Sequence, residues 1–215
     1  MKDGNREGRF DRLRDLCEFL DGIEKPVLLV EGTRSLPDGD TPLLRQLGAL
    51  LAKRLPGAIF RTGNAEGSDT AFAQGVASVE PGRIQFVLPT AGMGRSRIPA
   101  ESPRFVLADV SPPAQDRLAE YTVRATGTRD TLRMVQAVSG ELQNSRLAAK
   151  GRYVMRDALK VVGDAAVGLA PATAGVFYLK PDDPMYGGTG HTIRVCMQHV
   201  VPVVFQGTWM KWLPN

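Results

Sequence analysis

The chain has 215 residues, of which 43% are hydrophobic and 23% charged, a balance typical of one globular domain and unlike a disordered or collagen-like chain. No stretch approaches eighteen uninterrupted apolar residues, and the opening MKDGNREGRF has no apolar run after its charges, so neither a membrane span nor a secretory signal is expected. Cys17 and Cys196 stand far apart without a CxxC pair. This excludes a disulfide framework and a cysteine-based zinc site, and it favours the reducing cytoplasm.

The net charge of +4 is unevenly distributed. Residues 89–160 carry twelve positive and seven negative charges, a net of +5, whereas the rest of the chain is close to neutral. This segment suggests an anionic ligand or partner nearby, and a solvated arginine-rich helical face is the competing interpretation.

The first half of the chain alternates between predicted strands and helices. A helix over about 9–20 is followed by a short apolar strand at 26–30, a helix at about 41–54, a strand at 58–61, a helix at about 68–77 and a strand at 84–88. Thr41 and Pro42 are typical of a helix start. Strands and helices alternating over short connections predict an α/β fold with a parallel sheet.

The second half returns to this pattern after a proline-rich stretch at 89–113, in which 104–108 is a candidate short strand. Helices are predicted at 114–126, 128–148 and 151–162, then a strand at 175–179, a helix at about 191–199 and a strand at 201–205. We expect one Rossmann-like domain over 1–215, with a parallel sheet of about five strands flanked by helices, the N-terminal helix at about 9–20 and a helical insertion at about 89–150.

Three glycine-containing turns are candidates for a binding site. They are EGTR at 31–34, TGNAEGSD at 62–69 and GGTGHT at 187–192. In an open parallel sheet, ligands bind beyond the carboxyl ends of the strands, and these turns are expected there. Glycine allows a phosphate to approach backbone N–H groups closely, and the N-terminus of the following helix attracts an anion. None of the turns is a standard nucleotide-binding fingerprint, and each taken singly is also typical of an ordinary strand-to-helix connection.

The three turns together resemble the SLOG superfamily, the Rossmann-like domains shared by the DNA-processing protein A family and the cytokinin-activating phosphoribohydrolases. GTR, TGNAEGSDTAFAQG and GGTGHTIRV followed by PVV are similar to the turns that form one pocket in small nucleotide-binding proteins of bacteria and their phages. RYVMRDALKVVG at 152–163 is similar to a helix of those proteins that usually begins with Arg-Asn, with Asp157 in the place of the Asn. The resemblance covers about 27–77 and 152–205.

The resemblance implies a nucleotide or nucleotide-sugar site, and we expect no cofactor. The residues it implies as lining the site are Gly32, Thr33, Arg34, Gly63, Gly67, Asp69, Gly188 and Thr189. His191, at the start of the last long helix, is a further candidate, as a neutral hydrogen-bonding group that contacts phosphate or shuttles a proton. The second turn departs from the family pattern, with Gly63-Asn64 where Gly-Gly is usual.

A catalytic carboxylate is absent at the third turn. The phosphoribohydrolases carry PGGxGTxxE, whose Glu acts on the ribosyl bond, and Thr192 takes its place here. Glu31, Glu66 and Asp69 are the candidates to replace it. Asp69 would accept a hydrogen bond from ribose or else stabilise its own helix N-terminus, and Glu66 would be an acid or base or else a solvated glutamate.

Three functions follow from these observations. The first is a protein that binds or senses a phosphorylated nucleoside and releases it unchanged. The second is an enzyme that cleaves a nucleotide's N-glycosidic bond, and the third is a single-stranded DNA-binding protein of the DNA-processing type, supported by the basic segment 89–160. No metal site is expected, because His191 and His199 have no carboxylate in their helix to complete a triad. Trp209 and Trp212 are interpreted as an anchor for the C-terminal tail or as a contact in a homo-oligomer.

Overall fold

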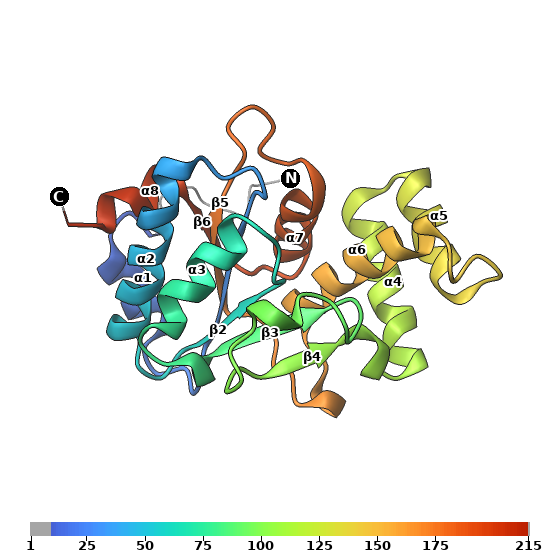
Figure 1. Cartoon of the computed structure of the whole chain (residues 1–215), viewed down its shortest axis with the longest axis horizontal. Coiled ribbons are helices and arrows are strands. Elements are labelled where there is room, and N and C mark those ends of the chain that lie inside the picture. The colour runs from blue at the N-terminus through green and yellow to red at the C-terminus, as the bar shows by residue number, and fades with distance from the viewer. Residues whose placement is uncertain (1–9, 215) are drawn as a thin grey trace.

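The computed structural model describes residues 10–214 and has three layers, with a central sheet between two groups of helices (Figure 1). Six strands pair in parallel in the order β4-β3-β2-β1-β5-β6. They are β1 (Val27–Gly32), β2 (Ile59–Thr62), β3 (Ile84–Leu88), β4 (Arg104–Val106), β5 (Ala174–Tyr178) and β6 (Val203–Phe205). The predicted α/β, Rossmann-like parallel sheet is confirmed. The sixth strand is β4, which the sequence analysis left as a candidate and which pairs with the edge of β3.

Helices cover both faces of the sheet (Figure 1). Buried residues of α1 (Leu13–Leu20), α2 (Thr41–Arg54), α3 (Ser68–Ala77) and α8 (Gln206–Trp209) pack on one face, against Leu28, Phe60 and Phe86. Those of α4 (Pro112–Thr126), α5 (Arg129–Ser139), α6 (Arg146–Val162) and α7 (Gly187–Gln198) pack on the other, around Leu29, Val87 and Phe177. Side chains alternate between the two faces along each strand, so both faces need apolar residues, and β1 is buried throughout.

Local sequence explains where the helices begin and end. Gly127 has a left-handed φ of 65° and ends α4, and Thr128 then accepts a hydrogen bond from the N–H of Thr131 to cap α5. The single helix predicted over 128–148 is two helices, because the chain leaves the helix at Gly140 and Ser145 caps α6 through the N–H of Ala148. The N-terminal helix begins at Leu13, and the predicted start at residue 9 lies outside the described residues.

The strand order sets the position of a crevice. From β1 to β4 the chain adds strands in one direction, and it then crosses back so that β5 lies on the other side of β1. The helix that follows β1, α2, covers one face of the sheet, and the helix that follows β5, α7, covers the opposite face. Connections leave in opposite directions at such a switch point, and in open α/β sheets the ligand-binding crevice lies there, so it is expected at the carboxyl ends of β1 and β5.

Candidate functional site

The three glycine-containing turns lie together at the carboxyl edge of the sheet, and hydrogen bonds join them. Thr189 on α7 donates its hydroxyl to the carbonyl of Gly32 at 2.8 Å, which links the third turn to the first. Ser68 at the start of α3 donates its backbone N–H at 3.1 Å and its hydroxyl at 2.9 Å to the carbonyl of Thr33, which links the second turn to the first. The turns therefore form one connected unit beside the switch point.

Asp69 holds two of these turns in place. Its side chain is buried, and it accepts backbone N–H bonds from Gly32, Gly63 and Ala65, each at 3.2 Å. Both carboxylate oxygens are used, Oδ1 by Gly32 and Oδ2 by the other two. Such bonds satisfy N–H groups that the turns would otherwise leave unpaired, so the geometry accounts for Asp69 as a brace without a ligand.

The glycines of the first two turns allow close packing of the turns on each other. A Cβ on Gly32 would lie 2.4 Å from the carbonyl oxygen of Tyr178, and one on Gly67 would lie 2.5 Å from that of Arg34. Gly67 also has a φ of +78°, which other residues rarely adopt. A Cβ on Gly63 would lie 1.6 Å from Nη1 of Arg156. At these three positions a side chain would meet other parts of the protein, which gives each glycine a structural reason that needs no ligand.

The third turn is more open. Helix α7 begins at Gly187, so the Gly-Gly-Thr-Gly segment forms its first turn, and the start predicted at His191 is one turn late. Gly187 and Gly188 are exposed, and α7 has no side-chain cap. A Cβ on Gly187 would meet nothing within 4 Å. The N-terminal amides of α7 therefore face solvent beside the crevice, where an anion is favoured.

Arg34 places a cation at the same edge. Its side chain is exposed and forms no ion pair within residues 10–214, and its guanidinium carbon lies 5.7 Å from the centre of the Tyr153 ring. Tyr153 is half-buried on α6 and donates its hydroxyl to the sulfur of Met93 at 2.6 Å. The cation is thus held near the crevice while its hydrogen-bonding groups remain free for a ligand.

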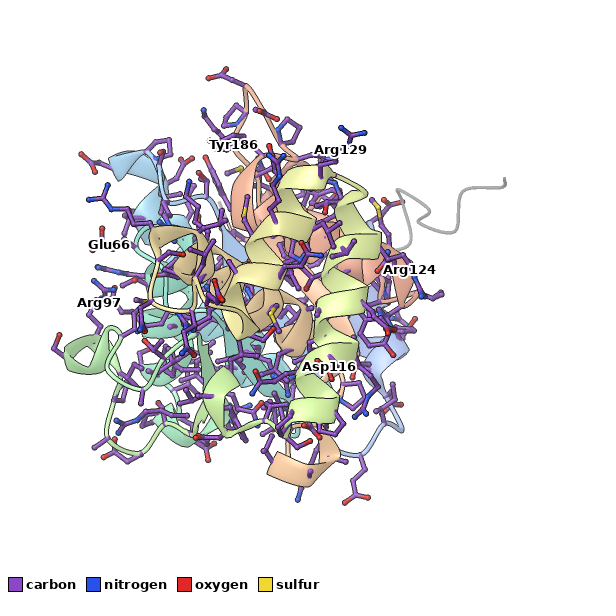
Figure 2. The ribbon with its side chains drawn as sticks, turned by 90° about the vertical axis from the view of Figure 1, so that its right-hand side faces the viewer. Glu66, Arg97, Asp116, Arg124, Arg129 and Tyr186 are labelled. Atoms are coloured by element: carbon purple, nitrogen blue, oxygen red, sulfur yellow. The ribbon has the colours of Figure 1, made fainter. Side chains whose placement is uncertain are left out.

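Glu66 points outward (Figure 2). It is exposed and forms an ion pair with Arg97 at 2.9 Å, across the second turn and the loop after β3. The same loop is bound through Asn64, whose side-chain amide donates to the carbonyl of Gly94 at 3.1 Å. Glu66 therefore helps to attach the loop to the second turn, at a distance from the buried groups described next.

A cluster of buried charges lies under the crevice, on the side covered by α6 and α7. Lys160 binds Oε2 of Glu31 at 2.6 Å and Oδ1 of Asp157 at 2.8 Å, and Nε of Arg156 lies 3.4 Å from the same Oδ1. All four side chains are at least 95% buried. Arg61, equally buried, donates to the carbonyl of Lys160 at 2.7 Å. Burying charges is costly unless they are paired, and here two carboxylates and one ammonium share a single site.

The charges of this cluster shift each other's titration. Burial raises the pKa of Glu31 to about 7 although Lys160 opposes the rise. Burial acts in the same way on Asp157, but Lys160 and Arg156 outweigh it and hold the pKa of that carboxyl below its ordinary value. The environment therefore shifts the two carboxylates in opposite directions, Asp157 towards the ionised form and Glu31 towards the protonated form, a separation that recurs in acid–base sites.

His191 is buried next to this cluster. Its side chain is only 2% exposed, and a hydrogen bond with the backbone of Val154 accounts for one ring nitrogen, so the other has no partner within the described residues. Burial lowers its pKa even though Asp157 opposes this, so the imidazole is neutral at pH 7. A neutral imidazole has one donor and one acceptor, so one polar group of this ring is left without a partner among the described residues.

The sequence analysis did not name Arg156 or Lys160 as site residues, and it named Asp157 only as a departure from the helix of the resemblance. The sequence pattern that could have indicated these three residues is their spacing at i, i+1 and i+4 of one helix, among the apolar residues Ala158, Leu159 and Val161. Glu31 has a similar signal, since it ends an otherwise apolar strand. Charges set within apolar runs are expected to be paired across elements, but sequence alone does not say with which partner.

Other features lie away from this edge. A cavity of about 580 Å³ is lined by α4, α5 and Met155 of α6, with Asp116 and Leu132 among its residues. Between residues 10 and 214, no group of three or more His, Cys, Asp or Glu side chains is arranged to hold a metal ion. In the same range no helix is long and apolar enough to cross a bilayer.

Comparison with known proteins yields no relative. No protein-family model matches the chain, nor does any curated sequence or solved structure. The resemblance to the SLOG superfamily therefore stays a hypothesis from three turns and one helix, and the function has to be argued from the geometry of the site.

Proposed function

We propose that the protein binds a nucleotide, such as a nucleoside monophosphate, at the carboxyl edge of the sheet between β1 and β5, and that it releases this ligand unchanged. The observation that carries the proposal is the strand order, which puts the switch point beside the exposed first turn of α7. Ligands of open α/β sheets bind at this place.

Two kinds of group support a phosphate there. The first turn of α7 offers backbone N–H groups and the positive end of the helix dipole at Gly187 and Gly188. Arg34 adds a guanidinium with free donors, which suits the geometry of phosphate oxygens. Together they provide directed hydrogen bonds and positive charge without a metal ion.

Hydrolysis of the N-glycosidic bond is the second candidate, and one observation favours it. Oδ2 of Asp157 lies 3.1 Å from the Cβ position of Gly188, so a carboxylate from α6 stands at the turn where the sequence offers none. A carboxylate near the reacting carbon stabilises an oxocarbenium-like charge or takes a proton from the attacking water. Of the earlier candidates, Asp69 is engaged by backbone amides, Glu66 by Arg97 and Glu31 by Lys160.

A thermal-shift screen tests the proposal. The protein is melted with each ribonucleoside 5′-monophosphate, with the matching nucleoside and with inorganic phosphate. A ligand at 100 times its Kd stabilises the folded protein by about 2.7 kcal/mol. For a chain of this size that corresponds to a rise in melting temperature of roughly 5–11 °C. The proposal fails if no nucleotide raises the melting temperature.

Chromatography of the same mixtures separates binding from hydrolysis. We expect the nucleotide to be recovered intact after incubation. Release of free base that Asp157→Asn abolishes would replace the binding function by the hydrolase. Release that persists in Asp157→Asn but not in Glu66→Gln would assign the reaction to Glu66.

A further inference from the structure

One oxygen of the buried carboxylate of Asp157 is free for a ligand. Asp157 is 3% exposed, and both of its ion-pair partners, Lys160 and Arg156, lie at Oδ1. Oδ2 lies on the side of α7, 3.1 Å from the Cβ position of the exposed Gly188. Among the described residues no donor makes a hydrogen bond to Oδ2. The carboxylate is therefore held firmly by one oxygen and presents the other to the proposed nucleotide site.

We propose that Oδ2 of Asp157 accepts a hydrogen bond from a ribose hydroxyl of the bound nucleotide, so that the site selects nucleotides that carry these hydroxyls. The inference rests on the proposed function and names its ligand more closely. It makes Asp157 a specificity-determining residue.

The chemistry of an ionised carboxylate requires a donor at this position. Lys160 and Arg156 keep Asp157 ionised, and an ionised carboxylate accepts hydrogen bonds but donates none. A second anion placed against Oδ2 would be repelled, whereas a neutral hydroxyl would satisfy the oxygen. Inorganic phosphate alone therefore fits the first turn of α7 less well than a phosphate that carries a sugar.

His191 gives an independent indication of a polar ligand. It lies on α7 one turn after Gly188, and Asp157 contributes to its electrostatic environment. One ring nitrogen interacts with the backbone of Val154, and the other is buried without a partner among the described residues, although buried polar atoms in folded proteins are nearly always paired. A neutral imidazole has one donor and one acceptor, as a hydroxyl has, so the two groups complement each other.

The position of the phosphate favours ribose over the base as the source of the donor. With the phosphate at the exposed amides of Gly187 and Gly188, the nearest neutral donors of a nucleoside 5′-monophosphate are those of the attached sugar. The N–H groups of the base lie beyond the sugar. A site that binds a hydroxyl with a buried charged acceptor discriminates strongly against a ligand that lacks it, because the acceptor is then left unsatisfied.

Calorimetry with matched ligands tests the inference. The probes are the four ribonucleoside 5′-monophosphates and their 2′,3′-dideoxy counterparts. Because a hydrogen bond to a charged group is worth about 1.5–3 kcal/mol, we expect the ribonucleotide to bind roughly 10- to 100-fold more tightly. In Asp157→Asn, the side-chain oxygen can stay with Lys160 and the amide then replaces the free acceptor by a donor. We expect the ratio of the affinities for the ribonucleotide and the dideoxynucleotide to fall towards one in this variant. The variant should also bind the dideoxynucleotide more tightly than the wild type does, because a negative charge has been removed.

Glu31→Gln is the matched control. It changes the other carboxylate that binds Lys160 to an amide, and it leaves the side chain beside Gly188 unaltered. It should keep the wild-type preference. Equal binding of both ligands by the wild type would overturn the inference and leave nucleotide binding intact. A proportional loss of both ligands in Asp157→Asn would reduce Asp157 to a structural role and also overturn it. Absence of binding to any nucleotide would remove the proposed function and the inference together.

Discussion

Replacing Asp69 by alanine distinguishes a brace from a ligand-binding residue. The substitution removes the acceptor of three backbone N–H groups, those of Gly32, Gly63 and Ala65. A buried donor left unpaired costs about 1–3 kcal/mol. Gly32 and Gly63 are buried, while Ala65 is half-buried and within reach of water, so we expect a total loss of about 3–5 kcal/mol. For a chain of this length that lowers the melting temperature by roughly 6–20 °C.

Glu66→Ala is the control for this experiment, because Glu66 lies three residues away on the same turn and makes only an exposed ion pair. Its loss should change the unfolding free energy by less than about 1 kcal/mol. Both variants are measured by urea denaturation and by calorimetry with the nucleotide found in the screen. If Asp69→Ala melts like the wild type but no longer binds nucleotide, the carboxylate contacts the ligand and its description as a brace is wrong.

Four further predictions follow from other parts of the structure. Arg34→Ala should weaken nucleotide binding by about 1.5–3 kcal/mol in calorimetry and leave the melting temperature unchanged, since the side chain is exposed; unaltered affinity would remove Arg34 from the site. Gly75→Ala should lower stability by about 1–3 kcal/mol, because its Cβ would lie 2.1 Å from the carbonyl oxygen of Arg45 where α3 crosses α2, whereas Gly39→Ala, with open space around it, should be neutral in the same melting assay. Because burial raises the pKa of Glu31 from 4.5 to about 7, its contribution to stability is present below pH 4.5 and is lost as the pH rises through 7. The unfolding free energy of Glu31→Gln, measured with urea, should therefore increase relative to that of the wild type between these two pH values. A difference that does not change with pH would contradict the raised pKa. Binding of single-stranded oligonucleotides by the basic segment 89–160 should be weak and nearly independent of salt. A steep fall of the binding constant with salt, with a slope of log K against log salt concentration near −0.7 per neutralised phosphate, would instead support the DNA-binding function.

The order of strands and helices could be predicted from local patterns. The apolar run at 26–30 and the start of a helix at Thr41-Pro42 each appear in the structure within a few residues of the predicted positions. Such patterns depend on side-chain periodicity and on capping, which act over one or two turns of chain. The boundary at 140–145 was missed, because Gly140 and Ser145 interrupt an apolar stripe that continues on both sides of them.

The site could be predicted only in part. The three glycine-containing turns indicated the edge of the sheet, but the close packing around Gly32, Gly63 and Gly67 could not be predicted. A Cβ on Gly63 would collide with Arg156, a residue 93 positions later in the chain, and no local pattern contains that contact. The carboxylate missing from the third turn was also supplied by another element, since Asp157 reaches Gly188 from α6.

The sequence by itself determined the α/β class, the parallel alternation and the turns at which a ligand is expected, because these depend on periodicity and backbone preference within short segments. Only the tertiary structure decided which side of β1 takes β5, and with it the position of the switch point. It also decided that Lys160 pairs with Glu31, 129 residues away in the chain, and that Asp69 accepts its hydrogen bonds from backbone amides. The partners of a buried charge are selected by the packing of whole elements, and the cost of leaving the charge unpaired enforces that selection only after the chain has folded.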